Sequence, residues 1–97
     1  MAFNRDRGMG REDAERLAIA CLGLIAEEAE TLGRFLSVTG LGPETLRNAA
    51  AEPGFLAAVI EYMLADESLL LQASERFRVR PTQFALARHE LGRGLDE

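Results

Sequence analysis

Several residue types that carry chemistry are scarce in this sequence. Its 97 residues include a single cysteine, Cys21, and a single histidine, His89, with neither lysine nor tryptophan. One cysteine excludes an intramolecular disulfide, and one cysteine with one histidine cannot supply the four ligands that a zinc site usually takes. With one tyrosine and five phenylalanines, the core must consist mainly of aliphatic side chains.

Long hydrophobic runs are also missing. The longest apolar stretch, residues 17–26, has ten residues, whereas a membrane span needs about 20. The residues before it carry four arginines and four acids, so they lack the net positive charge that begins a secretory signal. We therefore expect a cytoplasmic protein with no membrane partner.

Residues that favour strands are few. Three valines, three isoleucines and four threonines stand against fifteen alanines and fifteen leucines. This balance predicts an all-α protein, because alanine and leucine are good helix formers and β-branched residues favour strands. The length allows one domain. We expect a disordered leader at residues 1–10, a compact helical domain at residues 11–92 and a frayed tail at residues 93–97.

Glycines and prolines divide this domain into about six short helices. Pro43, Pro53 and Pro81 each suit the first turn of a helix, Asp66 suits an N-cap, and Gly40 suits a left-handed C-terminal residue. Apolar residues at helical spacing predict one shared core. The residues expected to face it include Ala14, Leu17, Cys21, Leu24, Ile25, Phe35, Leu56, Val59, Ile60, Met63, Leu70, Ala73, Phe77, Phe84, Leu86, Ala87 and Leu91.

The chain also shows an internal repeat at an offset of 38 residues. Leu17 falls on Phe55, Pro43 falls on Pro81, and apolar positions and helix breakers match in one register. Two related three-helix halves around one core are one interpretation. Two unrelated halves of similar spacing are the other.

Residues 17–91 resemble the family of small bacterial helical proteins known as domain of unknown function 3572. The resemblance is most specific in the segment Leu32-Gly33-Arg34-Phe35-Leu36 with Thr39-Gly40-Leu41, and it continues through residues 43–47, 53–59 and 66–70. This chain departs from the family in having Ala29 after the acidic cap, where members have proline, and no glycine near Arg78. The resemblance implies the helical architecture and brings no activity, cofactor or catalytic residue with it.

The candidate catalytic residues do not form a recognisable set. Cys21 lies in an apolar stripe, so we expect a buried core residue rather than a reactive thiol. His89 has no nucleophile set around it, and we expect it on the surface. Glu27, Glu28 and Glu30 lack calcium-loop spacing, and the glycines match no phosphate-binding loop. We expect neither an enzyme nor a cofactor or metal site.

An arginine cluster is the exception to an otherwise acidic chain. The net charge is −5, but residues 76–93 hold five arginines and one acid. A turn at Pro81 between two helices resembles a helix–turn–helix, which makes a small DNA-binding protein the alternative hypothesis. The acidic sequence pI of about 4.9 argues against nucleic acid as a partner. The nucleic-acid contacts in that alternative are Arg76, Arg78 and Arg80 for phosphates, and Thr82, Gln83 and Arg88 for bases.

Two apolar residues are expected to point into solvent. Ile19 shares its helix face with charged residues, and Leu71 shares its face with Ser74, Glu75 and Arg78. Exposed apolar side chains that adjoin would form a patch for a partner. Our leading hypothesis is a non-enzymatic protein-interaction module that binds another protein, or a second copy of itself, through Ile19 and Leu71.

Overall fold

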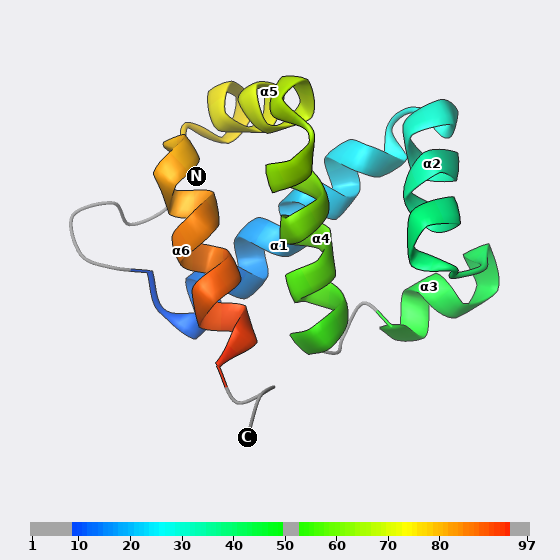
Figure 1. The fold of residues 1–97 in the computed structure, drawn as a ribbon, viewed down its shortest axis with the longest axis horizontal. Coiled ribbons are helices and arrows are strands. Elements are labelled where there is room, and N and C mark those ends of the chain that lie inside the picture. The colour runs from blue at the N-terminus through cyan, green and yellow to red at the C-terminus, as the bar shows by residue number, and fades with distance from the viewer. Residues whose placement is uncertain (1–8, 50–52, 94–97) are drawn as a thin grey trace.

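A computed structural model describes residues 9–49 and 53–93, which form helices and no strand. The all-α fold class is therefore confirmed over this part of the chain. The helices, shown in Figure 1, are α1 (Arg11–Ala26), α2 (Ala29–Thr39), α3 (Pro43–Ala49), α4 (Pro53–Ala65), α5 (Glu67–Phe77) and α6 (Pro81–Gly92). Within these described ranges, no helix is both long and apolar enough to cross a bilayer.

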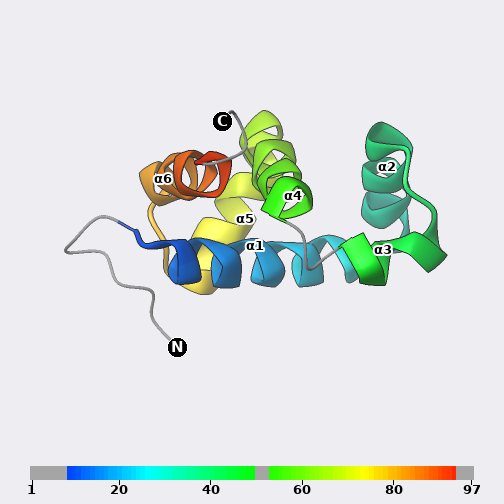
Figure 2. The same cartoon turned by 90° about the horizontal axis from the view of Figure 1, so that it is seen from below.

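The long helix α1 is the base on which the other helices are arranged. Helices α4 and α6 lie side by side on one side of α1, and these three helices pack closely against one another (Figures 1 and 2). Helix α5 connects α4 to α6 at one edge, while α2 and α3 lie at the far end of α1. The Cα radius of gyration is 12.6 Å, close to the ~12.5 Å expected of a compact domain of this length.

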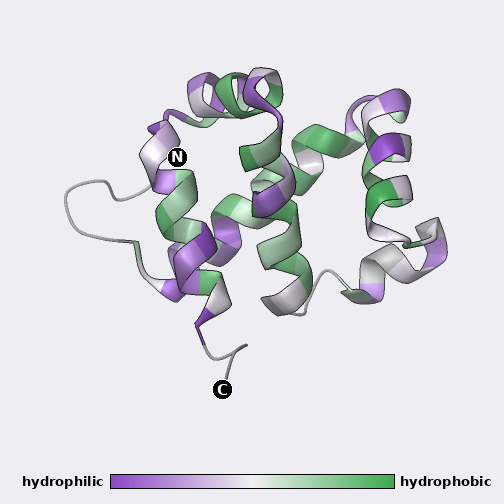
Figure 3. Ribbon diagram, viewed as in Figure 1, coloured by the Kyte–Doolittle hydropathy of each residue, from purple (hydrophilic) through white to green (hydrophobic). Residues whose placement is uncertain are grey.

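The core lies where α1, α4 and α6 meet. Its largest fully buried side chains come from four helices and from the loop before α6, and aliphatic residues dominate, as the composition predicts. Figure 3 shows apolar residues along most of α4 and along the side of α1 that faces it. Among the described residues, the largest fully buried side chains are Phe35, Phe84, Leu17, Ile25, Ile60, Met63, Leu91, Val59, Val79 and Cys21.

Local chemistry sets the helix ends largely as predicted. The Asp66 carboxylate accepts a hydrogen bond from the Leu69 backbone N–H at 3.1 Å, which is a side-chain N-cap. Gly40 ends α2 in the left-handed conformation, with φ +76°. Arg78 ends α5 in the same conformation, with φ +56°, and is the non-glycine residue with positive φ among those described.

The packing corrects some predictions. Leu86 was expected to face the core but is 42% exposed, because the arc of α6 that α1 and α4 cover is centred on Phe84, Ala87 and Leu91. In α5 the buried leucine is Leu69, while Leu70 is only partly buried. Three consecutive leucines span about 200° of a helix, so their periodicity alone does not fix which one points inward.

The ordered structure begins earlier than predicted. Met9, which was assigned to the leader, is buried in the core, and Gly10 occupies the N-cap position of α1. In the predicted tail, Arg93 directly follows α6 and has extended backbone. Residues 1–8 and 94–97, which make up the rest of the predicted leader and tail, lie outside the described residues.

The two halves repeat local structure but not packing. Helices α2 and α5 begin and end 38 residues apart, and each is followed by a left-handed residue, while α3 and α6 both begin at a proline. Among the described residues, however, α6 packs along both α1 and α4, whereas α3 has no comparable contact with α1. The same helix boundaries therefore support two different tertiary arrangements.

Candidate functional site

The lone cysteine belongs to the core. Cys21 is fully buried, and burial raises the pKa of its thiol from 9.0 to about 12, because the thiolate would lose its hydration. His89 is exposed on α6. In the described part of the chain, histidine, cysteine and acidic side chains form no group of three or more placed to hold a metal ion.

The arginine cluster is divided among separate ion pairs. Arg76 Nη1 lies 2.8 Å from Glu27 Oε2, which joins α5 to the end of α1. Arg88 Nη2 lies 2.6 Å from Glu61 Oε2, which joins α6 to α4. These contacts neutralise two of the arginines proposed for DNA binding with carboxylates from the acidic part of the chain. Both pairs are half-exposed, so each contributes little to stability.

The structure contradicts one base contact of the helix–turn–helix alternative, Gln83. Thr82 and Arg80 are exposed, but Gln83 is only 6% exposed, so its amide cannot reach a base edge. Its Oε1 atom is buried without a hydrogen-bond partner. The cause is the position of α6, which packs against both α1 and α4 and buries Gln83 with the core residues of α6.

Ile19 and Leu71 are exposed, at 54% and 52% respectively. Each lies on the side of its helix opposite the buried residues, as the helical spacing predicts. In the described helices, α1 and α5 are not a closely packed pair.

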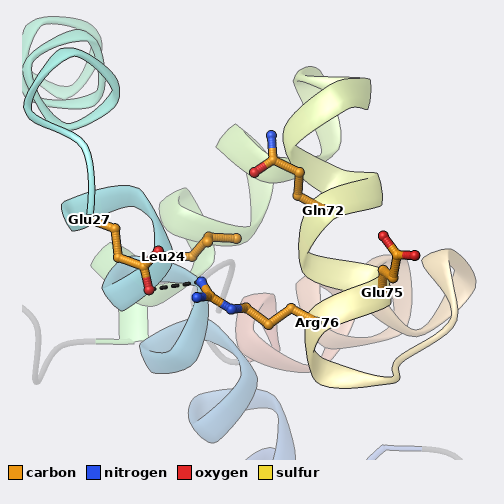
Figure 4. Close-up of a pocket in the computed structure, with 5 residues that line it drawn as sticks. All are labelled: Leu24, Glu27, Gln72, Glu75 and Arg76. Carbon is orange, nitrogen blue, oxygen red and sulfur yellow. Dashed lines mark hydrogen bonds and ion pairs between the residues drawn. The ribbon is translucent and has the colours of Figure 1, made fainter.

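A charged hollow lies between the end of α1 and α5 (Figure 4). Its volume is about 440 Å³, and Leu24, Glu27, Gln72, Glu75 and Arg76 line it. Figure 4 shows Arg76 reaching from α5 toward Glu27, with Leu24 pointing from α1 toward α5. All of the polar lining side chains are exposed to water, and so the hollow is a hydrated surface feature.

A second, more apolar groove lies between α2 and α4. It has a volume of about 400 Å³, and we name it the α2–α4 groove. Its lining residues are Val38, Thr39, Ala58, Glu61, Tyr62 and Ala65. Val38, on the α2 side, is 70% exposed. This is the largest exposed fraction of any large apolar residue in the described part of the chain.

The ring of Phe35 lies between α2 and α4, the two helices that form the walls of this groove. This ring is fully buried and meets the rings of Phe55 and Tyr62 edge-on, with centroids 5.9 Å and 5.2 Å away. Edge-to-face contacts of this kind are favourable beyond the area that they bury. The side chain of Phe35, rather than close contact between helix backbones, therefore connects α2 to α4.

Glu61 is the acidic residue among those that line the groove. Arg88 Nε donates a hydrogen bond to Oε2 of Glu61 at 2.7 Å, and Arg88 Nη2 lies 2.6 Å from the same oxygen in an ion pair. Among the described residues, no side-chain hydrogen bond reaches Oε1 of Glu61. The carboxylate therefore retains an oxygen that can accept a bond from outside the molecule.

Sequence reasoning did not find the α2–α4 groove. One signal was present, because α4 contains a single charged residue and is apolar on nearly all sides. Such a composition is typical of a helix covered on every face. The sequence does not show that one face of α4 stays open, since this depends on where α2 docks.

Comparisons with known proteins identify the family. The family model described as "Protein of unknown function (DUF3572)" matches residues 11–94. Neither a curated protein nor a solved structure matches the chain. The matched region includes all six helices, and with it both walls of the α2–α4 groove. The chain thus belongs to the DUF3572 family of proteins of unknown function.

Proposed function

We propose that the protein is a non-enzymatic helical module that binds another protein through exposed apolar side chains. The observation that carries the proposal is the open face of α4. Ala58, Tyr62 and Ala65 lie on the side of this helix opposite its buried residues, and Ala65 is exposed. A helix with a solvated outer face normally carries polar residues there, so an apolar outer face is suited to a partner.

Other exposed apolar residues add to this surface. Ile19, Val38, Leu64, Leu71 and Leu86 are all more than a third exposed, and each lies on a different helix. Scattered exposed apolar residues are ordinary on soluble proteins. Ile19 and Leu71 are therefore secondary anchors in this proposal, and the face of α4 is the primary one.

Site-specific photo-crosslinking in cells that normally contain the protein tests the proposal. A photoreactive residue is placed at Val38, Leu71 or Ile19, and a control is placed at Glu12, which is exposed on a charged face of α1. We expect one or more of the apolar positions to give a discrete crosslinked partner that Glu12 does not give.

The purified partner then allows affinities to be compared. Replacing the crosslinking residue by glutamate should weaken binding at least tenfold, while circular dichroism of the variant stays unchanged. If no apolar position gives a product beyond that of Glu12, the module does not act through these side chains and the proposal fails.

A further inference from the structure

We propose, building on the function proposed above, that the α2–α4 groove binds an amphipathic helix of a protein partner, and that this helix carries basic residues beside its apolar face. The proposal depends on three features of the groove. These are the partly exposed apolar stripe of α4, the space beside Phe35 between α2 and α4, and the hydrogen bond of Arg88 to one oxygen of the Glu61 carboxylate.

The apolar stripe on α4 is long enough, and its end residues are small enough, for another helix to pack against it. Ala58 and Ala65 are seven residues apart, which places them about 10.5 Å apart along one side of the helix. Small side chains at both ends allow another helix to approach closely, because interaxial distance depends on the side chains at the contact. Two turns of stripe match the i, i+3, i+4 and i+7 anchors of a helix bound in a groove.

The gap between α2 and α4 has room for such anchors. Phe35 fills one part of the space between the helices, and the α2–α4 groove of about 400 Å³ remains. Binding pockets commonly have volumes of about 300–1,000 Å³. Val38 and Tyr62 form apolar walls on opposite sides, so inserted aliphatic side chains would lose contact with water.

The charge around the groove favours a cation. Arg88 occupies only Oε2 of Glu61, so a lysine or arginine of the partner can bond to Oε1. Helix α2 also ends beside the groove, at Val38 and Thr39, and a helix C-terminus carries partial negative charge. The whole chain has a net charge of −5, which steers a basic partner toward it.

The protein contains its own reporter for occupation of the groove. Tyr62 lines the groove and is the single tyrosine in a chain without tryptophan. Its fluorescence can be followed with peptides that lack aromatic residues. The probes are two synthetic amphipathic helices with the same leucine and alanine face, one with lysines and arginines on its polar face and the other with glutamates.

The variants place the same charge inside and outside the groove. Val38→Glu puts a carboxylate into the groove, and Ser37→Glu puts one on the neighbouring exposed position of α2, which does not line it. Both variants raise the negative charge equally, so general attraction of a basic peptide changes alike. Glu61→Gln removes the carboxylate charge that the basic residue is proposed to meet.

We expect the basic peptide to change Tyr62 emission saturably and the acidic peptide to bind at least tenfold more weakly. Val38→Glu should weaken binding of the basic peptide at least tenfold, and Glu61→Gln should weaken it about threefold. Ser37→Glu should leave this binding unchanged. Equal binding by Val38→Glu and Ser37→Glu, or equal binding of the two peptides, would overturn the groove assignment.

Two further outcomes separate this inference from the proposed function. Loss of binding only in Ile19→Glu or Leu71→Glu would overturn the groove as the site while leaving an interaction module in place. Self-association of the chain that Val38→Glu abolishes would assign the groove to a second copy and overturn the basic helix as its occupant. Failure of the crosslinking experiment at every apolar position would remove both proposals.

Discussion

The left-handed residue that ends α5 allows a quantitative test of the fold. Arg78 has φ +56° and ψ +48°, a conformation that costs a residue with a Cβ atom about 1–2 kcal/mol. Glycine avoids this cost but loses more backbone entropy on folding. We therefore expect Arg78→Gly to exceed Arg78→Ala in unfolding free energy by about 1 kcal/mol. Comparing the two variants with each other isolates the backbone, because both remove the guanidinium.

Urea unfolding followed by circular dichroism measures this difference. A gain of about 1 kcal/mol corresponds to a rise of about 4–8 °C in melting temperature for a domain of this size. Glu75 is an exposed α5 residue before Arg78, and there glycine should be less stable than alanine by up to about 1 kcal/mol. The sign of the difference must reverse between the two positions. Arg78→Ala matching or exceeding Arg78→Gly would show that α5 does not end in a left-handed residue.

Three further predictions concern a cap, the buried thiol and a loop. Asp66→Ala should cost about 1 kcal/mol in urea unfolding, and Glu28→Ala much less, because only Asp66 makes a side-chain cap bond. The free energy of unfolding should fall as the pH rises from about 9 toward 12, because the unfolded Cys21 thiol ionises near 9.0 and the buried one at about 12. Cys21→Val should not show this fall. Urea titrations at several alkaline pH values check this. Ser74→Ala should cost about 1 kcal/mol by thermal unfolding, because the Ser74 hydroxyl donates to the Val79 carbonyl.

Features encoded by local chemistry were predictable from the sequence. Asp66 caps α5 and Gly40 ends α2, because both effects depend on a few adjacent residues. Burial of Cys21 also followed from its position in a wide apolar stripe. Such features do not require knowledge of what packs against the helix.

Features that depend on neighbouring helices were not predictable to the same degree. Leu86 was assigned to the core and is exposed, while Gln83, a base contact in the DNA-binding alternative, is buried. The two residues are about 60° apart around the axis of α6, on the same side of the arc that α1 and α4 cover, and the docking of those helices fixes where the buried arc ends between them. The α2–α4 groove escaped prediction for the same reason, since α4 is apolar on several sides and only the position of α2 shows which side is open.

The attachment of α2 has a consequence for the lifetime of the groove. Phe35 is the fully buried side chain of this helix, and Leu32 and Leu36 are only partly buried. Segments with few buried apolar contacts open at a lower free energy than the rest of a domain. Amide hydrogens of α2 should therefore exchange with solvent faster than those of α1 or α4. Helix α2, one wall of the groove, then unfolds locally at a lower free energy than the rest of the domain. A bound helix would slow the exchange of its amide hydrogens.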